Sequence, residues 1–321
     1  MNLLSVEQLT IGFGSVRPVD RVDFSVVAGE VMGLVGESGS GKSLILRAIL
    51  GLLPRSAAVG GRIVWQGTDL LTLTERALNA TVRGKHIAIV FQEPMTALDP
   101  VLPIGLQITE SLAVHRDLRG RAARARAVEL LELVGIPGAS RRLDAFPHEL
   151  SGGMRQRAMI AIALAPGPKL LLADEPTTAL DVTIQDQILK LLLRLRQELA
   201  MSVILVTHDL GVVAETCDRV AVLYAGRMME TADVHTLFRA PAHPYTRGLI
   251  ASVPGALHPR QLLSSISGTP PDPRALPPGC RFAPRCPSVL AACNDGQPDN
   301  LLLAPGHQAA CLRALDFVVP Q

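Results

Sequence analysis

The sequence is poor in aromatic side chains and has no long apolar run. Only 3% of its 321 residues are Phe, Trp or Tyr, although 48% are hydrophobic. No segment reaches the roughly 18 to 20 uninterrupted apolar residues that cross a bilayer. The opening residues, MNLLSVEQLTIGFG, lack the basic region and cleavage site of a secretion signal. We therefore expect a globular protein that stays in the cytosol unless a partner holds it at a membrane.

Charge and cysteine are also scarce. The formal net charge is only +2, and the chain has four lysines, Lys42, Lys85, Lys169 and Lys190. This balance argues against a nucleic-acid binder that depends on a broad basic face. The one arginine-rich segment, residues 116–126, is typical of the solvated face of an amphipathic helix. Five cysteines in a reducing compartment are not expected to form disulfides.

The segment GESGSGKS fits the phosphate-binding pattern G-x-x-x-x-G-K-[ST]. Its glycines let backbone N–H groups surround phosphate oxygens, its lysine reaches the β- and γ-phosphates, and its last hydroxyl coordinates Mg²⁺. An apolar run, Val31–Val35, predicts a buried strand before the segment, and SLILRAILGLL predicts a helix after it. The sequence therefore predicts a nucleotide phosphate site. Its residues are Gly36, Ser38, Gly39, Ser40, Gly41, Lys42 and Ser43.

Polar side chains end three further apolar segments. HIAIVFQ reads as a buried strand that ends in Gln92, KLLLADE ends in Asp174 and Glu175, and SVILVTHD contains His208 near its end. The Gln92 amide oxygen suits Mg²⁺ or the attacking water, and Asp174 suits the Mg²⁺ shell. Glu175 is suited to polarise water, and His208 to donate a hydrogen bond to a γ-phosphate. Open α/β sheets bind ligands at such strand ends.

Two more features concern the nucleotide. The turn LSGGM places Ser151, Gly152 and Gly153 at a helix start, where free N–H groups can hold an anion. Phe13, one of few aromatic residues, is a candidate for stacking on an adenine ring. An ordinary core phenylalanine explains Phe13 equally well.

Taken together, these segments resemble the ATP-binding subunits of ABC transporters. GESGSGKS, FQEP, LSGGM, LLLADEP, TALD and VTHD occur in that family's order and approximate spacing over about residues 3–250. The resemblance implies an α/β fold with an ABC-type P-loop NTPase core, an antiparallel β edge and a helical signature subdomain over about residues 100–165. It also implies that ATP and Mg²⁺ are the cofactors.

The same resemblance implies a role for each matching residue. Gln92 becomes the Q-loop glutamine, Asp174 the Walker B acid, Glu175 the catalytic base, Asp181 part of the D-loop and His208 the switch histidine. None of these positions departs from the family pattern, so the resemblance implies a hydrolysing site.

Partners are implied as well. In the family, the signature amides of a second ATPase subunit bind the far side of the γ-phosphate. The segment 93–105 contacts the two transmembrane permease subunits. LSGGMRQRAMIAIAL and HPYTRGLIASVP are similar to the ATPases of dipeptide and oligopeptide permeases. This closer resemblance implies a heterodimer, an extracytoplasmic peptide-binding protein, and a peripheral position on the cytoplasmic face of the cell membrane.

Alternatives stay open for the solute and for the class of ATPase. The ATPases of nickel importers share many of these sequence motifs. A soluble ABC ATPase acting on nucleic acid or ribosomes is less favoured, because no long coiled coil or second cassette is present, and no nucleic-acid partner is expected. A non-hydrolysing regulator would lack the base, whereas Glu175 is present.

The sequence changes character near residue 254. About half of the 24 prolines fall in the last ~70 residues. We therefore expect a nucleotide-binding domain over residues 1–253 and a small, irregular, Cys-rich extension over 254–321. Four cysteines lie there with the spacing C-x5-C-x6-C-x17-C: Cys280, Cys286, Cys293 and Cys311. This spacing favours a structural [4Fe–4S] cluster, with Zn²⁺ or unligated thiols as alternatives. Peptide-permease ATPases are similar in carrying such cysteines.

Overall fold

A computed structural model describes residues 2–178, 180–253 and 266–318 of the chain. The chain divides into two compact units. The first unit contains residues Met1–Thr72 and Leu205–Gln321, and the second contains residues Leu73–Ile204. The two units are treated separately below.

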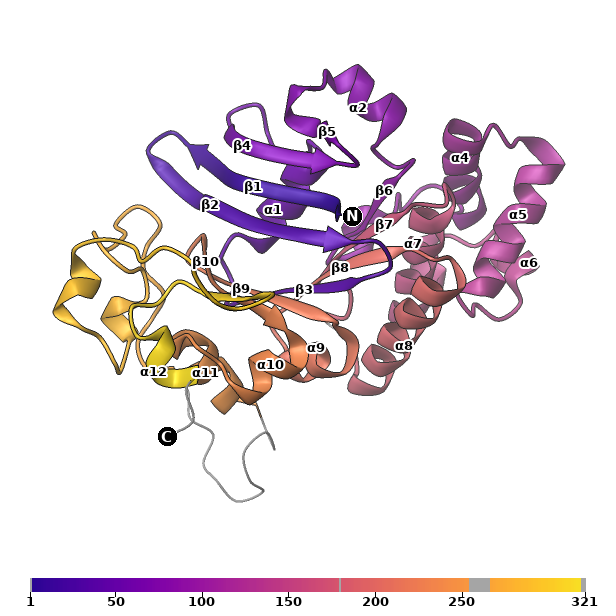
Figure 1. Cartoon of the computed structure of the whole chain (residues 1–321). Helices are drawn as coiled ribbons and strands as arrows, with labels where there is room; N and C mark the ends of the chain where they lie inside the picture. The colour runs from indigo at the N-terminus through magenta and orange to yellow at the C-terminus, as the bar shows by residue number, and fades with distance from the viewer. Residues whose placement is uncertain (1, 179, 254–265, 319–321) are drawn as a thin grey trace. The chain divides into compact units, whose positions relative to one another are not determined.

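The first unit contains a four-stranded antiparallel sheet in the order β2-β1-β4-β5 (Figure 1). Its strands are β1 (Asn2–Phe13), β2 (Val16–Val27), β4 (Ala58–Trp65) and β5 (Thr68–Asp69). Burial alternates along much of β1, as expected for a sheet with one face on a core. Gln8 breaks the β1–β2 register with a φ of 49°, and its N–H donates to Asp23 Oδ1 at 2.8 Å. This sheet is the antiparallel edge that the sequence led us to expect.

The same unit holds a second set of strands. β3 (Val31–Val35) pairs in parallel with β9 (Arg219–Tyr224), and β9 pairs antiparallel with β10 (Arg227–Asp233). Every residue of β3 is buried, as the continuous apolar run predicts. The helices of this unit are α1 (Lys42–Ile49), α9 (Leu210–Thr216), α10 (Val234–Arg239) and α11 (Pro244–Ala251), and a short 3-10 helix spans Leu70–Thr72.

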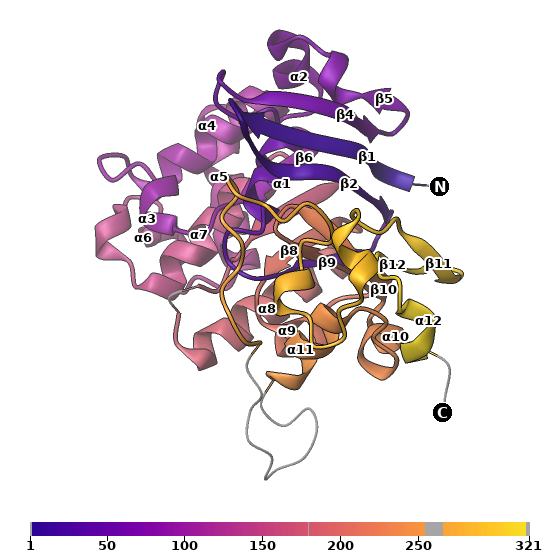
Figure 2. The ribbon, with the colours of Figure 1, turned by 90° about the vertical axis from the view of Figure 1, so that its left-hand side faces the viewer.

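The C-terminal region, which in the described part of the chain is residues 266–318, pairs with β10 rather than forming a separate layer. β12 (His307–Ala309) pairs with β10, and β11 (Leu301–Ala304) pairs with β12, as the yellow hairpin beside β10 shows (Figure 2). The remaining elements are 3-10 turns at Ala283–Arg285 and Ala291–Asn294 and the helix α12 (Ala314–Val318).

A buried carboxylate fixes this junction. Glu230 of β10 is fully buried and accepts the N–H groups of Ala242 and His243 at 2.8 and 2.9 Å. It also lies 2.9 Å from Nε2 of the buried His307 of β12. Because a buried carboxylate needs such partners, Glu230 ties three chain segments to one point.

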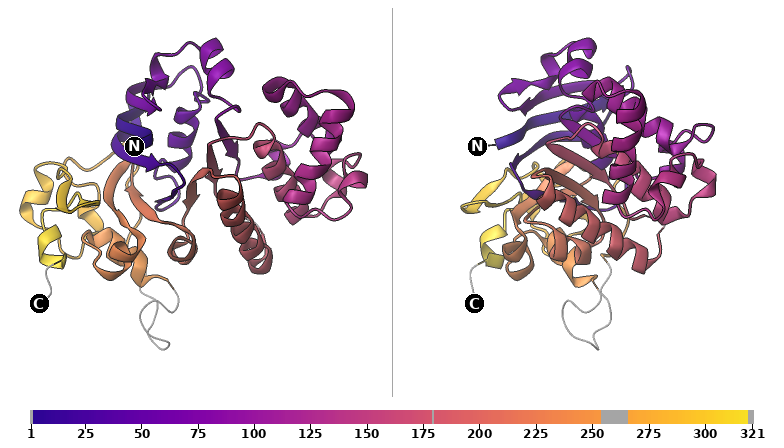
Figure 3. Two further views of the ribbon diagram at one scale, coloured as in Figure 1. Left: turned by 45° about the vertical axis from the view of Figure 1, so that its right-hand side comes forward. Right: turned by 90° about the vertical axis from the view of Figure 1, so that its right-hand side faces the viewer.

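The second unit contains parallel strands and a set of helices (Figure 3). β6 (Ile87–Val90) pairs in parallel with β7 (Leu170–Asp174). Its helices are α2 (Glu75–Thr81), α3 (Pro94–Ala97), α4 (Ile104–Arg116), α5 (Gly120–Leu133), α6 (Ala139–Arg142), α7 (Gly152–Leu164) and α8 (Val182–Glu198), with a 3-10 turn at Pro147–Glu149. β8 (Ser202–Thr207) begins in this unit and ends in the first.

Within the stretch of about residues 100–165, where we expect a helical subdomain, the structure has α4, α5, α6 and α7, which contact one another. The arginines of α5 lie on its exposed face, as expected. Arg124 makes a bidentate ion pair with Asp144 at 2.7–3.0 Å, and Arg126 pairs with Glu129 at 2.6 Å. One boundary was wrong: β6 ends at Val90, so Gln92 lies in the loop beyond the strand.

The buried His243 gives the first unit a pH dependence. Burial lowers the pKa of His243 to about 3, and its Nδ1 accepts the N–H of Tyr245 at 3.0 Å. In the unfolded chain this histidine has the ordinary pKa of about 6.5. Between about pH 6.5 and pH 3, the unfolded chain therefore binds a proton that the folded chain does not bind. Stability contributed by neutral His243 is therefore lost as pH falls below 6.5.

We expect His243→Asn, which keeps an acceptor for Tyr245, to remove this dependence. Between pH 7.5 and pH 5, the wild-type free energy of unfolding should fall by about 2 kcal/mol more than that of the variant. Urea unfolding of both proteins across this range measures the difference. A constant gap between the two curves would contradict the assignment.

Candidate nucleotide site

The predicted phosphate-binding loop connects β3 to α1 in the first unit. Gly36 has a φ of 152°, and a Cβ at this position would overlap the carbonyl oxygen of Leu223. Gly41, directly before α1, has a φ of 105°, and a Cβ there would lie 2.9 Å from the Pro18 carbonyl oxygen. Both positions therefore require glycine because of the backbone conformation and the close approach of neighbouring chain.

Lys42 lies inside this loop and is only 5% exposed. Its Nζ donates to the carbonyl oxygens of Gly36 and Glu37 at 2.8 and 2.9 Å and to Ser40 Oγ at 3.3 Å. Ser43 follows in the first turn of α1. A buried ammonium group surrounded by loop backbone at a helix start is suited to binding phosphate.

The predicted acidic residues lie where the sequence indicated, at the end of a buried strand. All five residues of β7 are buried, and Asp174 is its last residue. Glu175 follows with a φ of 44°, which is unusual for a residue with a side chain. Such a backbone conformation costs about 1–3 kcal/mol. The surrounding structure holds Glu175 in this conformation.

Two side chains orient the Glu175 carboxylate within the second unit. Gln92 Nε2 donates to Glu175 Oε2 at 3.3 Å, so the structure brings these two predicted site residues together. Thr178 Oγ1 donates to the same oxygen at 2.9 Å. The sequence analysis missed Thr178. Its only signal was a hydroxyl three residues after the acid, in the phrase EPTT.

The LSGGM turn forms the start of α7. Ser151 is the N-cap residue, and its Oγ accepts the N–H of Met154 at 3.4 Å. Ser151 and Gly152 are exposed. A Cβ on Gly153 would lie 2.9 Å from Ile184 Cγ2 of α8, so the glycine permits α7 and α8 to approach closely. The N-terminal end of α7 is thus available to an anion.

The remaining predicted residues occupy three separate positions. Phe13 is half-buried at the end of β1, opposite Val16. Asp181 is exposed at the N-cap position of α8. His208 is exposed and follows β8, just before Asp209 begins α9.

The predicted residues are divided between the two units. The phosphate loop, Phe13 and His208 belong to the first unit, and Gln92, Ser151, Gly152, Gly153, Asp174, Glu175 and Asp181 belong to the second.

The four C-terminal cysteines lie near one another but are not arranged as a ligand set. The N–H of Cys280 donates to the Cys293 carbonyl at 2.7 Å. Burial raises the pKa of the Cys311 thiol to about 11, and the nearby thiols of Cys286, Cys280 and Cys293 contribute in the same direction. Within the described ranges, no three His, Cys, Asp or Glu side chains are grouped to hold a metal ion. The expected [4Fe–4S] or Zn²⁺ site therefore has no support in this geometry, although the residue types fit such a group.

Cys217 is buried away from this region, as the sequence indicated. Burial raises the pKa of its thiol to about 12.

In the residues that the structure describes, no helix combines the length and the apolar character needed to cross a membrane.

Comparisons with known proteins agree with this geometry. Residues 19–178 match the ABC transporter family, and residues 229–293 match the family described as oligopeptide/dipeptide transporter, C-terminal region. The oligopeptide transport ATP-binding protein AppD of Bacillus subtilis is 50% identical over 295 residues, which cover 91% of this chain and 90% of AppD. The dipeptide transport ATP-binding protein DppD of Escherichia coli is 46% identical over 321 residues, or 98% of each chain.

Solved structures of ATP-binding cassettes have the same fold. The dimeric, post-hydrolysis structure of the ATP-binding cassette MJ0796 bound to ADP and Pi has a TM-score of 0.64 at 30% identity, covering 72% of this chain and 98% of that one. The cbiO1 protein of Clostridium perfringens, part of an ABC transporter complex, has a TM-score of 0.63 at 28% identity, covering 74% and 90%. The chain is therefore an ATP-binding protein of the ABC transporter family, in the branch that carries the oligopeptide/dipeptide transporter C-terminal region.

Proposed function

We propose that this chain hydrolyses ATP to power an importer of dipeptides or oligopeptides. The observation that carries the proposal is the match of residues 229–293 to the oligopeptide/dipeptide transporter C-terminal region. Two relatives named for dipeptide and oligopeptide transport, 46–50% identical over almost the whole chain, support it further.

The proposal assigns a role to each site residue according to its chemistry. The loop residues Gly36, Ser38, Gly39, Ser40, Gly41 and Lys42 hold the phosphates of ATP, and Ser43, Gln92 and Asp174 hold Mg²⁺. Glu175 polarises the attacking water, and Gln92 and His208 respond to the γ-phosphate. Phe13 stacks on the adenine ring, and Asp181 belongs to the surface that meets the second nucleotide site.

The cycle that we propose depends on a second ATPase subunit. The amides of Ser151, Gly152 and Gly153, with the dipole of α7 behind them, face the γ-phosphate held by the partner. Association is favoured while the triphosphate is present, and hydrolysis removes the shared anion and releases the two subunits. We propose a related but different ATPase as the partner, so that the pair is a heterodimer.

The remaining partners follow from transport. Two transmembrane permease subunits would receive the motion through the segment 93–105, where Met95 is 48% exposed. An extracytoplasmic peptide-binding protein would deliver the solute, and this chain would be peripheral on the cytoplasmic face of the membrane. Copurification from a native membrane extract tests this set. Recovery of permeases with a nickel-binding protein instead would favour a nickel importer.

The Glu175→Gln variant tests hydrolysis. The amide keeps the shape of the carboxylate but cannot act as a base, so we expect kcat for ATP hydrolysis to fall at least about 100-fold while ATP still binds and holds the ATPase pair together. Phosphate release and size-exclusion chromatography with ATP measure both effects.

Glu132→Gln is the matched control, because Glu132 is an exposed glutamate of α5 in the same unit. It should hydrolyse ATP at the wild-type rate. Retained hydrolysis in Glu175→Gln would rule out the role proposed for Glu175.

A metal cluster on Cys280, Cys286, Cys293 and Cys311 is also a proposal. It rests on the number and spacing of the four cysteines in the sequence. When bound, such a cluster would supply a structural cross-link to a region with little core of its own.

Anaerobically purified protein should contain about four irons per chain and absorb near ~400 nm if this cluster is present. Cys293→Ser should lose the iron, whereas Cys217→Ser, which changes the buried cysteine outside the extension, should retain it. Protein that contains zinc or no metal would disprove the iron assignment.

A further inference from the structure

Arg285 of the C-terminal region binds the side chain of Glu37 in the phosphate-binding loop. Arg285 lies at the end of the 3-10 turn Ala283–Arg285, and Glu37 is the second residue of the loop. Arg285 Nη1 donates to Glu37 Oε2 at 2.7 Å, and Nη2 donates to Glu37 Oε1 at 3.0 Å. The Arg285 side chain is 5% exposed, so this bidentate pair is largely shielded from water.

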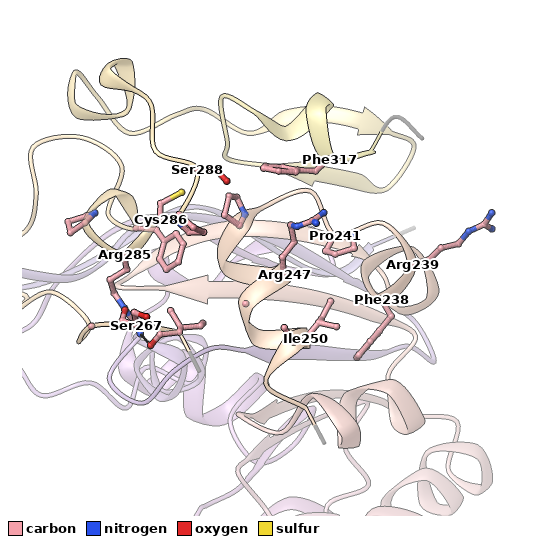
Figure 4. Close-up of a pocket in the computed structure, with 18 residues that line it drawn as sticks. Phe238, Arg239, Pro241, Arg247, Ile250, Ser267, Arg285, Cys286, Ser288 and Phe317 are labelled. Carbon is pink, nitrogen blue, oxygen red and sulfur yellow. Dashed lines mark hydrogen bonds between the residues drawn. The ribbon is translucent and has the colours of Figure 1, made fainter. Parts of the chain in front are cut away.

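All five N–H groups of the Arg285 guanidinium have an acceptor. Besides Glu37, Nη1 reaches Tyr224 Oη at 3.2 Å, Nε donates to the Ser267 carbonyl at 2.9 Å, and Nη2 donates to the Ile266 carbonyl at 3.2 Å. Arg285 and Ser267 lie together at one side of a pocket that α10, α11 and the C-terminal region line (Figure 4). The guanidinium is therefore fixed in position by groups of the protein itself.

Glu37 is held at its backbone as well as its carboxylate. Its N–H donates to Tyr245 Oη at 2.9 Å, and its carbonyl oxygen accepts from Lys42 Nζ at 2.9 Å. Tyr245 is fully buried, with its ring 4.6 Å from that of Tyr224 and 5.3 Å from that of Phe282. Glu37 thus contacts both Lys42 of the loop and Arg285 of the C-terminal region.

A second contact region lies beside the first. The prolines of the segment Pro270–Pro273 and Leu276 line a cavity of about 290 Å³ together with Ser38, Gly39 and Ser40 of the loop. The C-terminal region therefore contacts the phosphate-binding loop through an ion pair and also lines a cavity beside the loop, both within the first unit.

We propose that Arg285 is a positioning residue for the phosphate-binding loop. By fixing Glu37, it holds the loop amides and Lys42 in the conformation that receives the nucleotide phosphates. The C-terminal region is then part of the nucleotide site rather than an appendage. This inference rests on the proposed binding of ATP to residues 36–43.

We expect Arg285→Gln to weaken the binding of MgADP and MgATP to the full-length chain about tenfold, a typical size for such coupling. In the assembled transporter the KM for ATP should rise by a similar factor while kcat stays within about twofold, because the proposal gives Arg285 a role in binding nucleotide and none in activating water. Calorimetry and steady-state hydrolysis measure the two effects.

Arg281→Gln is the matched control. Arg281 lies four residues away, is also buried, and pairs with Asp20 at 2.7 Å rather than with the loop. Its loss should lower thermal stability but leave nucleotide affinity unchanged. Equal affinity losses in both variants, or none in Arg285→Gln, would overturn the proposal.

A double-mutant cycle with Glu37→Gln separates positioning from general stability. If Arg285 acts through Glu37, the double variant should bind no more weakly than either single variant. Additive losses would contradict this coupling. If Arg285→Gln does not fold, Arg285→Lys keeps the charge, and it should retain only part of the affinity because lysine cannot make the bidentate contact.

The result remains distinct from a failure of the proposed function. Wild-type protein that binds nucleotide but does not hydrolyse it would refute only the ATPase assignment. Wild-type protein that binds no nucleotide would refute the binding site and, with it, the role of Arg285.

Discussion

Glu37 of the phosphate-binding loop is held at three points, through its N–H, its carbonyl oxygen and its carboxylate. Tyr245 accepts its N–H, Lys42 donates to its carbonyl, and Arg285 binds its carboxylate. In a loop that binds an anion, several amide N–H dipoles point toward one place and repel one another. Other contacts must hold the loop against this repulsion. Lys42 is a neighbour within the loop, whereas Tyr245 and Arg285 are more than 200 positions away in the sequence. The local motif thus depends on distant packing.

Local sequence was a good guide where a strand or helix is decided by its own residues. The apolar runs that predict β3 and β7 are strands with every residue buried. The glycines of the loop were predicted for their freedom of φ, and the structure adds a second reason at Gly36, where the Leu223 carbonyl leaves no room for a Cβ. The helix predicted for SLILRAILGLL is present as α1, which spans Lys42–Ile49. These features depend on short-range chemistry, which a sequence displays directly.

Long-range contacts were beyond this kind of reasoning. Arg285 reads as one more arginine beside a cysteine, and nothing in its neighbours indicates Glu37 as its partner. Thr178 reads as a turn residue, and only the structure shows that its hydroxyl meets Glu175. The φ of 44° at Glu175 is likewise invisible in the sequence, since Pro176 favours an extended residue before it. Strain of this kind persists only because surrounding contacts determine it.

The C-terminal region shows how a segment with little core of its own is kept in place. Its elements are short, and its apolar cluster consists mainly of the small residues Ala242, Ala309 and Ala314. The fully buried Phe282 adds aromatic packing against Tyr224 and Tyr245. Three polar contacts also join the region to the rest of the first unit: Glu230 with His307, Asp20 with Arg281, and Glu37 with Arg285. One of these contacts is made with Glu37, so the segments that anchor the C-terminal region include the phosphate-binding loop itself.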